Sequence, residues 1–331
     1  MASLLDLLTG FLAAHLPTVP APTPAPPSSC PSPASPAPLP PPATTPLTSA
    51  MVEIPYASLL HPSSSLSPLL ASAYGPLGLG ILAVSGVPSL SRPRDELLRL
   101  AREVSLLPPA SLAATVSPDS HFQVGWSRGN EVLQGGEPDW AKGSYYANVL
   151  EDVPEPSDEE MGFGDWCGWH SDHGSLTGLV PALYLDRDGN EVPNPDPDAG
   201  LYIRGRDGSL IKAVVPPGAR DVLLFQIGET AQVHTGGVLQ ATPHAVKGAR
   251  GRAAEGVSRE TFAVFMEPEF DGDMSLPEGR TIEDVQGGEA VKFLPPSVRT
   301  LGSRWKEGMD FGAFSEATFS IFYNVVGEEE E

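Results

Sequence analysis

The sequence predicts a mainly β protein, with a double-stranded β-helix (jelly roll) core flanked by N- and C-terminal helices. Beyond Ser144, short runs rich in Val, Ile, Leu, Tyr and Phe alternate with tight-turn dipeptides, which is typical of antiparallel sheets. Before residue 110, by contrast, apolar residues recur at helical spacing. Hydrophobic residues make up 40% of the chain, yet no apolar run approaches the roughly 20 residues that span a bilayer. These observations favour two facing sheets around one core.

Residues 1–50 are expected to form a disordered extension. Of the 37 prolines, 14 lie between residues 16 and 50, in a tract of Pro, Ala, Ser and Thr that contains no charged residue. Such a segment cannot bury a core and favours disorder or polyproline II. The first basic residue is Arg92, so the Arg-rich composition of a transit peptide is absent. We therefore expect a cytoplasmic protein, with import into an organelle as the alternative.

The range 51–143 is expected to be the helical N-terminal region of the fold. Ile54 indicates a first strand, residues 69–74 a short helix and residues 80–84 a second strand. A longer helix is indicated by apolar residues at helical spacing, which are Leu97, Leu100, Ala101 and Val104. A pair of prolines a few residues later ends this helix, because proline disfavours a helical conformation in the residue before it.

The range 144–326 is expected to hold the jelly-roll core and a C-terminal helical segment, and 327–331 to be an acidic tail. Residues 201–203 and 210–215 flank Asp207-Gly208, a strong two-residue hairpin signal. Further strands are expected at 183–185, 222–227, 238–246 and 261–266. The aromatic-rich end of this range, 294–323, is expected to wrap back as the helical segment.

The charge balance restricts the partners. The chain has 20 basic and 42 acidic side chains and a formal net charge of −22, which argues against a nucleic-acid or anionic-membrane binder. Its two cysteines, Cys30 and Cys167, are far apart in unlike surroundings, so they form neither a disulfide framework nor a thiolate zinc site. We expect a monomer that acts on a small molecule.

A candidate metal site lies within the predicted β region. His170 and Asp172 are two residues apart, and on a strand this spacing projects both side chains from one face. A distant histidine would complete a set of two imidazoles and one carboxylate, the facial triad of non-haem Fe(II) oxygenases, and zinc is the competing metal. His244 is the candidate, because strand periodicity places it on one face with Gln240 and Thr242.

A candidate anion site follows downstream. Arg259 and Thr261 fall on one face of a predicted strand, and Phe262 and Val264 fall on the other. An inward-pointing arginine is costly to bury unless an anion pairs with it. A guanidinium fork beside a hydroxyl matches the far carboxylate of a dicarboxylate ligand. The alternative is an ordinary ion pair with one of the many acidic residues.

Four motifs in this order resemble those of the 2-oxoglutarate and Fe(II)-dependent oxygenases of the isopenicillin N synthase-like group. The matching segments are residues 170–177, 223–229, 244–246 and 259–262. Upstream, Ile54-Pro55 and residues 71–87 are similar to the N-terminal region of that group. The resemblance covers residues 52 to about 323.

The resemblance implies a role for each matching residue. His170, Asp172 and His244 would bind Fe(II), and Arg259 and Thr261 would hold the distal carboxylate of 2-oxoglutarate. The family often has an Asn-x-Tyr motif before the first histidine. Ser144-Tyr145-Tyr146 is the nearest match, with Ser in place of Asn and Tyr146 in the tyrosine position, which implies a cosubstrate contact for Tyr146.

The implied activity is that of a dioxygenase with Fe(II), 2-oxoglutarate and O2. It would couple oxidative decarboxylation of 2-oxoglutarate to hydroxylation or desaturation of a small organic metabolite. One alternative is an Fe(II) oxidase that uses the same triad without 2-oxoglutarate. The other is a non-catalytic β-barrel binding module.

Two further histidines are expected to lie outside the metal site. His173 follows Asp172 by one residue and should face away from it. His234 stands in the turn-like sequence Val233-His234-Thr235-Gly236-Gly237, which favours a solvated loop histidine.

Overall fold

The computed structural model describes residues 46–61, 65–117, 124–130, 139–147, 169–215, 219–286, 292–295 and 298–322. The chain divides into two units, Met1–Thr45 and Pro46–Glu331, and all described residues belong to the second unit. Most of the predicted disordered extension and the whole predicted acidic tail therefore lie outside the described residues. No described helix is long and apolar enough to cross a membrane.

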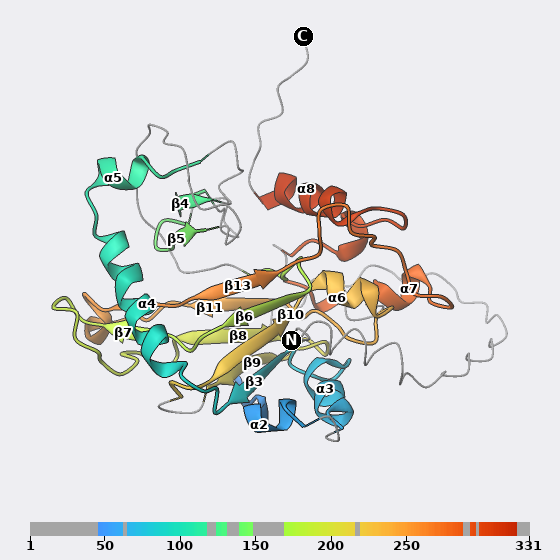
Figure 1. Cartoon of the computed structure of the whole chain (residues 1–331), viewed down its shortest axis with the longest axis horizontal. Helices are drawn as coiled ribbons and strands as arrows, with labels where there is room; N and C mark the ends of the chain where they lie inside the picture. Colours follow the sequence, from blue (N-terminus) through green and yellow to red (C-terminus); the bar gives the residue numbers. More distant parts are fainter. Residues whose placement is uncertain are drawn as a thin grey trace, which may run out of the picture. The chain divides into compact units, whose positions relative to one another are not determined.

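Two sheets form the jelly roll, as predicted (Figure 1). The four-stranded sheet has the order β1 (Leu47–Ala50), β9 (Leu210–Val214), β8 (Gly200–Arg204) and β11 (His244–Lys247). The five-stranded sheet has the order β13 (Ala263–Met266), β6 (Leu176–Leu179), β10 (Leu223–Ile227), β3 (Ile81–Ser85) and β2 (Val52–Pro55). Strand pairing is antiparallel except for β1 with β9 and β2 with β3.

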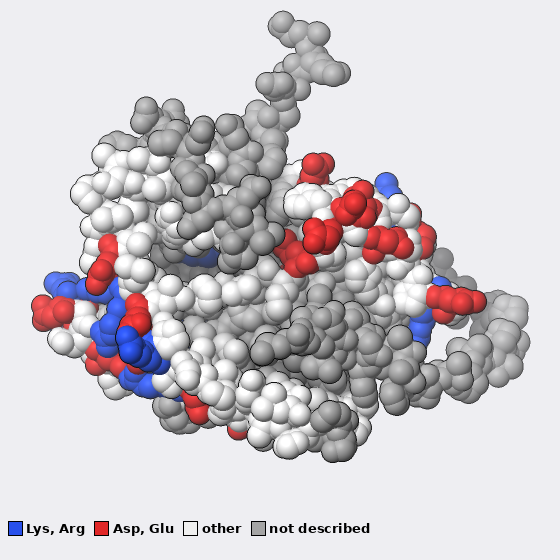
Figure 2. Space-filling view, viewed as in Figure 1, with Lys and Arg blue, Asp and Glu red and all other residues white. Residues whose placement is uncertain are grey.

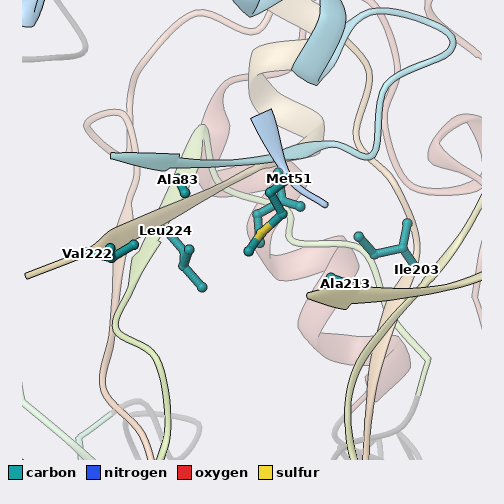
Figure 3. Close-up of a cluster of buried hydrophobic side chains, with 7 residues drawn as sticks. Met51, Ala83, Ile203, Ala213, Val222 and Leu224 are labelled. Atoms are coloured by element: carbon teal, nitrogen blue, oxygen red, sulfur yellow. The ribbon is translucent and has the colours of Figure 1, made fainter. Parts of the chain in front are cut away.

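The main hydrophobic core lies between these sheets. Ile203 and Ala213 come from the four-stranded sheet and Ala83 and Leu224 from the five-stranded sheet, and Figure 3 shows Met51 between them. Because side chains alternate along a strand, burial of Ile203 turns the next residue, Arg204, to the outer face of its sheet.

The predicted hairpin around Asp207-Gly208 joins β8 to β9, with Tyr202 opposite Lys212. Gly208 has φ of 82°, in the left-handed region that glycine adopts without a Cβ penalty. The turn sequence therefore fixes the register of two strands in the sheet that carries β11.

Helices cover the ends of the sheets. The two helices predicted in the N-terminal region are present as α3 (Ser67–Tyr74) and α4 (Ser91–Ser105). Two short helices that the sequence did not predict, α2 (Tyr56–Leu59) and α5 (Pro109–Ala113), precede and follow them. In Figure 1, α4 runs beside β7 (Leu183–Leu185) at the left. It buries Leu98 against Val180, Leu183 and Leu185.

A second hydrophobic cluster anchors the C-terminal segment. It joins residues of α6 (Glu229–His234), α7 (Ile282–Val285) and α8 (Phe311–Phe322), together with the 3-10 helix η4 (Leu301–Ser303). The members of the cluster are Val233, Met274, Val285, Leu301, Trp305, Phe311 and Phe314. This cluster packs the predicted C-terminal helical segment against α6, which directly follows β10.

Two small sheets complete the fold. β12 (Ser258–Glu260) pairs with β7, and β4 (Gly125–Arg128) pairs with β5 (Gly143–Tyr146). A short 3-10 turn, η2 (Arg252–Ala254), precedes β12. On the face drawn in Figure 2, basic and acidic side chains are interleaved around α4, whereas the region of α7 and α8 carries mostly acidic ones.

Two expected boundaries are wrong. Residues 47–50, assigned to the disordered extension, form β1, because their backbone pairs with the otherwise open edge of β9. The strands predicted at Ile54 and at residues 80–84 are present as β2 and β3, both in the five-stranded sheet. The strand expected over 238–246 begins only at His244, directly after Pro243, which has no N–H to donate to a ladder.

Candidate metal centre

His170 and His244 lie side by side on neighbouring segments. They form an isolated antiparallel bridge, in which each backbone N–H donates to the other residue's carbonyl, at 3.0 and 2.9 Å. Their ring centroids are 4.4 Å apart. His244 also lies opposite Ile203, whose side chain is in the core. Because directly opposite residues share a face of the sheet, both imidazoles point to the inner side of the jelly roll.

Asp172 completes the group. Its Oδ1 lies 3.5 Å from Nε2 of His170 and 3.7 Å from Nε2 of His244. One ligand atom from each residue lies within 4.8 Å of the others. Two ligand atoms that share one ion, each at about 2.1 Å, are at most about 4.2 Å apart, so both carboxylate distances fit a shared ion. The structure thus brings together the three residues that the sequence selected.

Two threonines orient these side chains. The hydroxyl of Thr177 donates to Oδ2 of Asp172 at 2.7 Å. Nδ1 of His244 lies 3.2 Å from the carbonyl oxygen of Thr242, which can only accept, so this nitrogen carries the proton. The lone pair of His244 is therefore on Nε2, the nitrogen that faces Asp172.

The electrostatics of the group keep it in the protonation state that metals bind. Burial raises the pKa of Asp172, but the charges of His244 and His170 and hydrogen bonds from His170 and Thr177 outweigh it, so the pKa lies well below its usual range. Burial first, and then the charge of His170, lowers the pKa of His244 to about 4. At neutral pH the carboxylate is ionised and the His244 imidazole is neutral.

Comparison of the sequence with known families and proteins gives a match to only part of the chain. No family model matches the chain. A UPF0676 protein of Schizosaccharomyces pombe is 33% identical over 153 residues, which are 44% of this chain, and the match spans only 39% of the length of that protein.

Solved structures match over most of the chain. A full-length Neurospora crassa protein in complex with alpha-KG has a TM-score of 0.53 at 14% identity, covering 81% of this chain and 95% of that one. JOX2 in complex with 2OG, Fe and JA has a TM-score of 0.51 at 15% identity, covering 82% and 85%. A 2OG-Fe(II) oxygenase family protein of Caulobacter crescentus has a TM-score of 0.50 at 14% identity, covering 82% and 98%. The chain has the 2-oxoglutarate and Fe(II)-dependent oxygenase fold.

Within this fold, the residues expected to bind 2-oxoglutarate lie on two separate segments, one at the end of β12 and one in β5. Arg259 is in β12, directly opposite Tyr184 of β7. Thr261 follows β12, and its hydroxyl lies 3.4 Å from the carbonyl oxygen of Val180. Tyr146 is the last residue of β5, opposite Gly125. Their cosubstrate contacts stay predictions.

The sequence did not single out Gln226, which lies inside the oxygenase fold beside the triad. Its side chain is only 2% exposed, and neither amide atom has a hydrogen-bond partner among the residues that the structure describes. Gln226 lies directly opposite Thr177, so both side chains share the inner face. An orphaned amide there fits a site built for a polar ligand, since buried polar groups otherwise find partners. The only sequence signal was its place within the motif at 223–229.

The sequence also missed a buried ion pair behind the triad. Both carboxylate oxygens of Glu229 accept from Nη2 of Arg304 at 2.6 Å, and Nη1 of Arg304 donates to Thr318 of α8 at 2.9 Å. The backbone N–H of Glu229 donates to the carbonyl of Asp172 at 2.8 Å. Gly228 makes this approach possible, because a Cβ at that position would collide with the Gly174 carbonyl. The C-terminal segment is thereby tied to the ligand segment.

His173 lies outside the triad, as predicted. Its ring stacks on Phe311 at 5.8 Å between centroids, and Nε2 lies 3.2 Å from the Ser315 hydroxyl. Burial lowers its pKa to about 4. The loop predicted for His234 is wrong, because this residue ends α6, with Nε2 at 2.8 Å from the Asp273 carbonyl oxygen. Gly236 and Gly237, the two glycines that suggested a turn, follow the C-terminal end of this helix.

Proposed function

We propose that this protein is an Fe(II)- and 2-oxoglutarate-dependent dioxygenase that hydroxylates or desaturates a small organic metabolite. The observation that carries the proposal is the inward-facing group of His170, Asp172 and His244, with all three ligand atoms within 4.8 Å. Two imidazoles and one carboxylate on one face are the ligand set of non-haem Fe(II) oxygenases. Fe(II) and 2-oxoglutarate, when bound, supply the oxygen activation and the oxidative decarboxylation to succinate.

The residues of the chain would hold and orient these groups. Thr177 keeps Oδ2 of Asp172 occupied, so that Oδ1 is directed between the two histidines. Thr242 fixes the tautomer of His244. These contacts are the kind of outer support that orients metal ligands in proteins.

The cosubstrate is proposed to be held by the protein at its distal carboxylate. Arg259 and Thr261 would hold the distal carboxylate, as a guanidinium and a hydroxyl do for dicarboxylates, with Tyr146 as a further contact. β13, which continues from this segment, places Phe265 opposite Thr177. The segment therefore leads from the proposed carboxylate site toward the triad.

The substrate is proposed to be a small organic molecule with apolar surface. The Neurospora crassa protein has been solved with thymine and with 5-formyluracil, and JOX2 with JA. In this chain Phe265 shares the inner face with Thr177 and is 52% exposed, so its ring offers an apolar wall near the triad. We also propose a cytoplasmic monomer, because a net charge of −22 disfavours self-association.

The experiment that tests the function is an anaerobic titration of the metal-free protein with Fe(II) and then with 2-oxoglutarate, followed by admission of O2 and assay of succinate. We expect one Fe(II) per chain, a new visible absorption on adding 2-oxoglutarate and slow succinate release. Iron binding without any response to 2-oxoglutarate would favour the oxidase that uses the same triad. A chain that binds no iron would instead be a non-catalytic barrel.

A further inference from the structure

A cavity lies behind the metal centre, on the outer side of the ligand segment. Ser171 lines it, whereas its neighbours His170 and Asp172 point to the inner side. Pro243, next to His244, forms another part of the wall. The cavity therefore shares backbone with all three proposed iron ligands while facing away from them.

The wall of this cavity carries an excess of positive charge. Three of its lining residues are Arg204, Arg206 and Arg299. Among the residues that the structure describes, no carboxylate lies within 4.0 Å of any of these three guanidinium groups. Glu229 is the one carboxylate among the described lining residues, and both of its oxygens are engaged by Arg304. In a chain with a net charge of −22, three arginines thus line one cavity without a carboxylate partner among the described residues.

Arg204 and Arg206 are each held in place by a hydrogen bond to a backbone carbonyl. Nη1 of Arg204 donates to the carbonyl of Gly208 at 2.8 Å, and its guanidinium lies 5.3 Å from the ring centroid of Trp169. Nη2 of Arg206 donates to the carbonyl of Ala241 at 2.9 Å. Nε of Arg204 is buried, and no described residue provides it with an acceptor. The guanidinium groups of Arg204 and Arg206 are therefore fixed in position, and they keep N–H donors that a ligand can use.

Burial without a carboxylate also affects Arg206 directly. Desolvation lowers its pKa to about 10, which still leaves it charged at neutral pH. A desolvated cation is stabilised by an anion far more than a solvated one, since the effective dielectric is lower. A guanidinium fork binds carboxylate and phosphate groups through two parallel hydrogen bonds.

The size of the cavity limits the occupant. Its volume is about 50 Å³. One water molecule occupies roughly 10–15 Å³ by the same measure, so the cavity holds roughly three to five waters. A phosphate group or a small carboxylate fits this space.

We propose that the cavity lined by Arg204, Arg206 and Arg299 is a second ligand site, which binds a small anion bearing a phosphate or carboxylate group. It lies on the outer face of the sheet, apart from the 2-oxoglutarate position proposed at Arg259. An anion bound here would reach the metal centre indirectly. Arg204 packs on Trp169, the neighbour of His170, and Arg206 donates to the loop before His244. The site is therefore suited to a regulatory anion.

The test is calorimetric titration of the full-length, metal-free protein with inorganic phosphate and, separately, with acetate at constant ionic strength. We expect saturable binding of one equivalent of at least one anion, and the preferred anion identifies the class of occupant. Arg206→Gln and Arg299→Gln should each weaken this binding at least tenfold. Arg299 is exposed, so its replacement leaves the fold intact. The matched control is Arg92→Gln, because Arg92 is exposed on α4 and forms an ion pair with Glu96, away from the cavity.

Two results would overturn the proposal: no saturable binding of either anion, or equal affinities in the native protein and both cavity variants. The result is independent of the dioxygenase proposal, because neither iron nor 2-oxoglutarate is present. Arg259→Gln provides the converse comparison and should leave phosphate or acetate binding unchanged. A loss of that binding in Arg259→Gln would place the anion at the cosubstrate position instead.

Discussion

Thr177 and Asp172 are joined by a 2.7 Å hydrogen bond from the threonine hydroxyl to Oδ2 of the carboxylate. This bond turns Oδ1 toward both His170 and His244. It also favours the ionised carboxylate, because a hydrogen bond to the charged form lowers a pKa. A residue outside the ligand set thus fixes both the direction and the charge of one ligand.

Replacing Thr177 by Val should weaken Fe(II) binding by about 10- to 100-fold while preserving the shape of the core. The valine removes the hydroxyl donor, so the Asp172 carboxylate is less well oriented and its pKa rises. Anaerobic Fe(II) titration measures the change. The control is Thr115→Val, since the Thr115 hydroxyl donates to the Leu112 carbonyl, outside the metal site. Equal iron affinity in the two variants would argue against the orienting role.

Replacing Asp172 by Ala should abolish stoichiometric Fe(II) binding and all succinate formation. Two imidazoles alone leave the site without its anionic ligand. Metal analysis after anaerobic loading gives the readout. His234→Gln is the control, because the structure places this histidine on α6 with a backbone contact to Asp273. Retained turnover in the Asp172 variant would refute the triad.

The sequence predicted the parts of this site that follow strand periodicity. His170 and Asp172 share a face because they are two residues apart, and the hairpin at Asp207-Gly208 fixes β8, against which β11 places His244. The Glu229–Arg304 pair could not be predicted in this way. It joins residues 75 positions apart through the packing of the C-terminal segment, which no local pattern encodes.

The sequence could not predict the buried amide of Gln226 for a related reason. In sequence it is one polar residue in an apolar strand, a pattern equally compatible with a partner across the sheet. The cavity behind the triad was hidden as well, since it depends on where Arg299 of the C-terminal segment meets Arg204 and Arg206. Local periodicity thus predicts which face a side chain occupies, whereas the packing of distant segments decides what it meets there.

Arg259→Gln should raise the 2-oxoglutarate concentration required for half-maximal succinate formation by about 10- to 100-fold. The estimate corresponds to losing a hydrogen bond to a charged group, about 1.5–3 kcal/mol. Iron affinity without the cosubstrate should stay the same. Arg252→Gln, an exposed substitution in the turn before β12, serves as the comparison. An unchanged cosubstrate requirement would assign Arg259 to an ordinary ion pair.

Arg304→Met should destabilise the folded state by about 3–5 kcal/mol, because it leaves the Glu229 carboxylate buried without its partner. The double variant Glu229→Gln with Arg304→Met should recover part of this loss. Urea unfolding of the metal-free proteins measures both. The exposed pair Arg92–Glu96 gives the reference, where Arg92→Met should cost less than about 1 kcal/mol. Equal effects at the two sites would mean that burial of the Glu229–Arg304 pair has no energetic consequence.

The stability of the metal-free protein should fall as the pH decreases from about 6.5 to about 4. Burial lowers the pKa of both His173 and His244 from 6.5 to about 4. Between these values the unfolded chain binds protons that the folded chain does not, so protonation favours unfolding. The stabilisation is present above pH 6.5 and is lost as the pH approaches 4.

Urea unfolding midpoints at pH 7.0 and pH 5.0 test this dependence. His173→Gln should reduce the difference between the two midpoints, because it removes one of the two depressed histidines without touching a proposed ligand. His234→Gln should leave the difference unchanged, since that ring is only partly buried. A loss of stability that is the same in all three proteins would place the pH sensitivity in the carboxylates instead. Saturating Fe(II) should enlarge the difference in the native protein, because protons compete with the metal for His244.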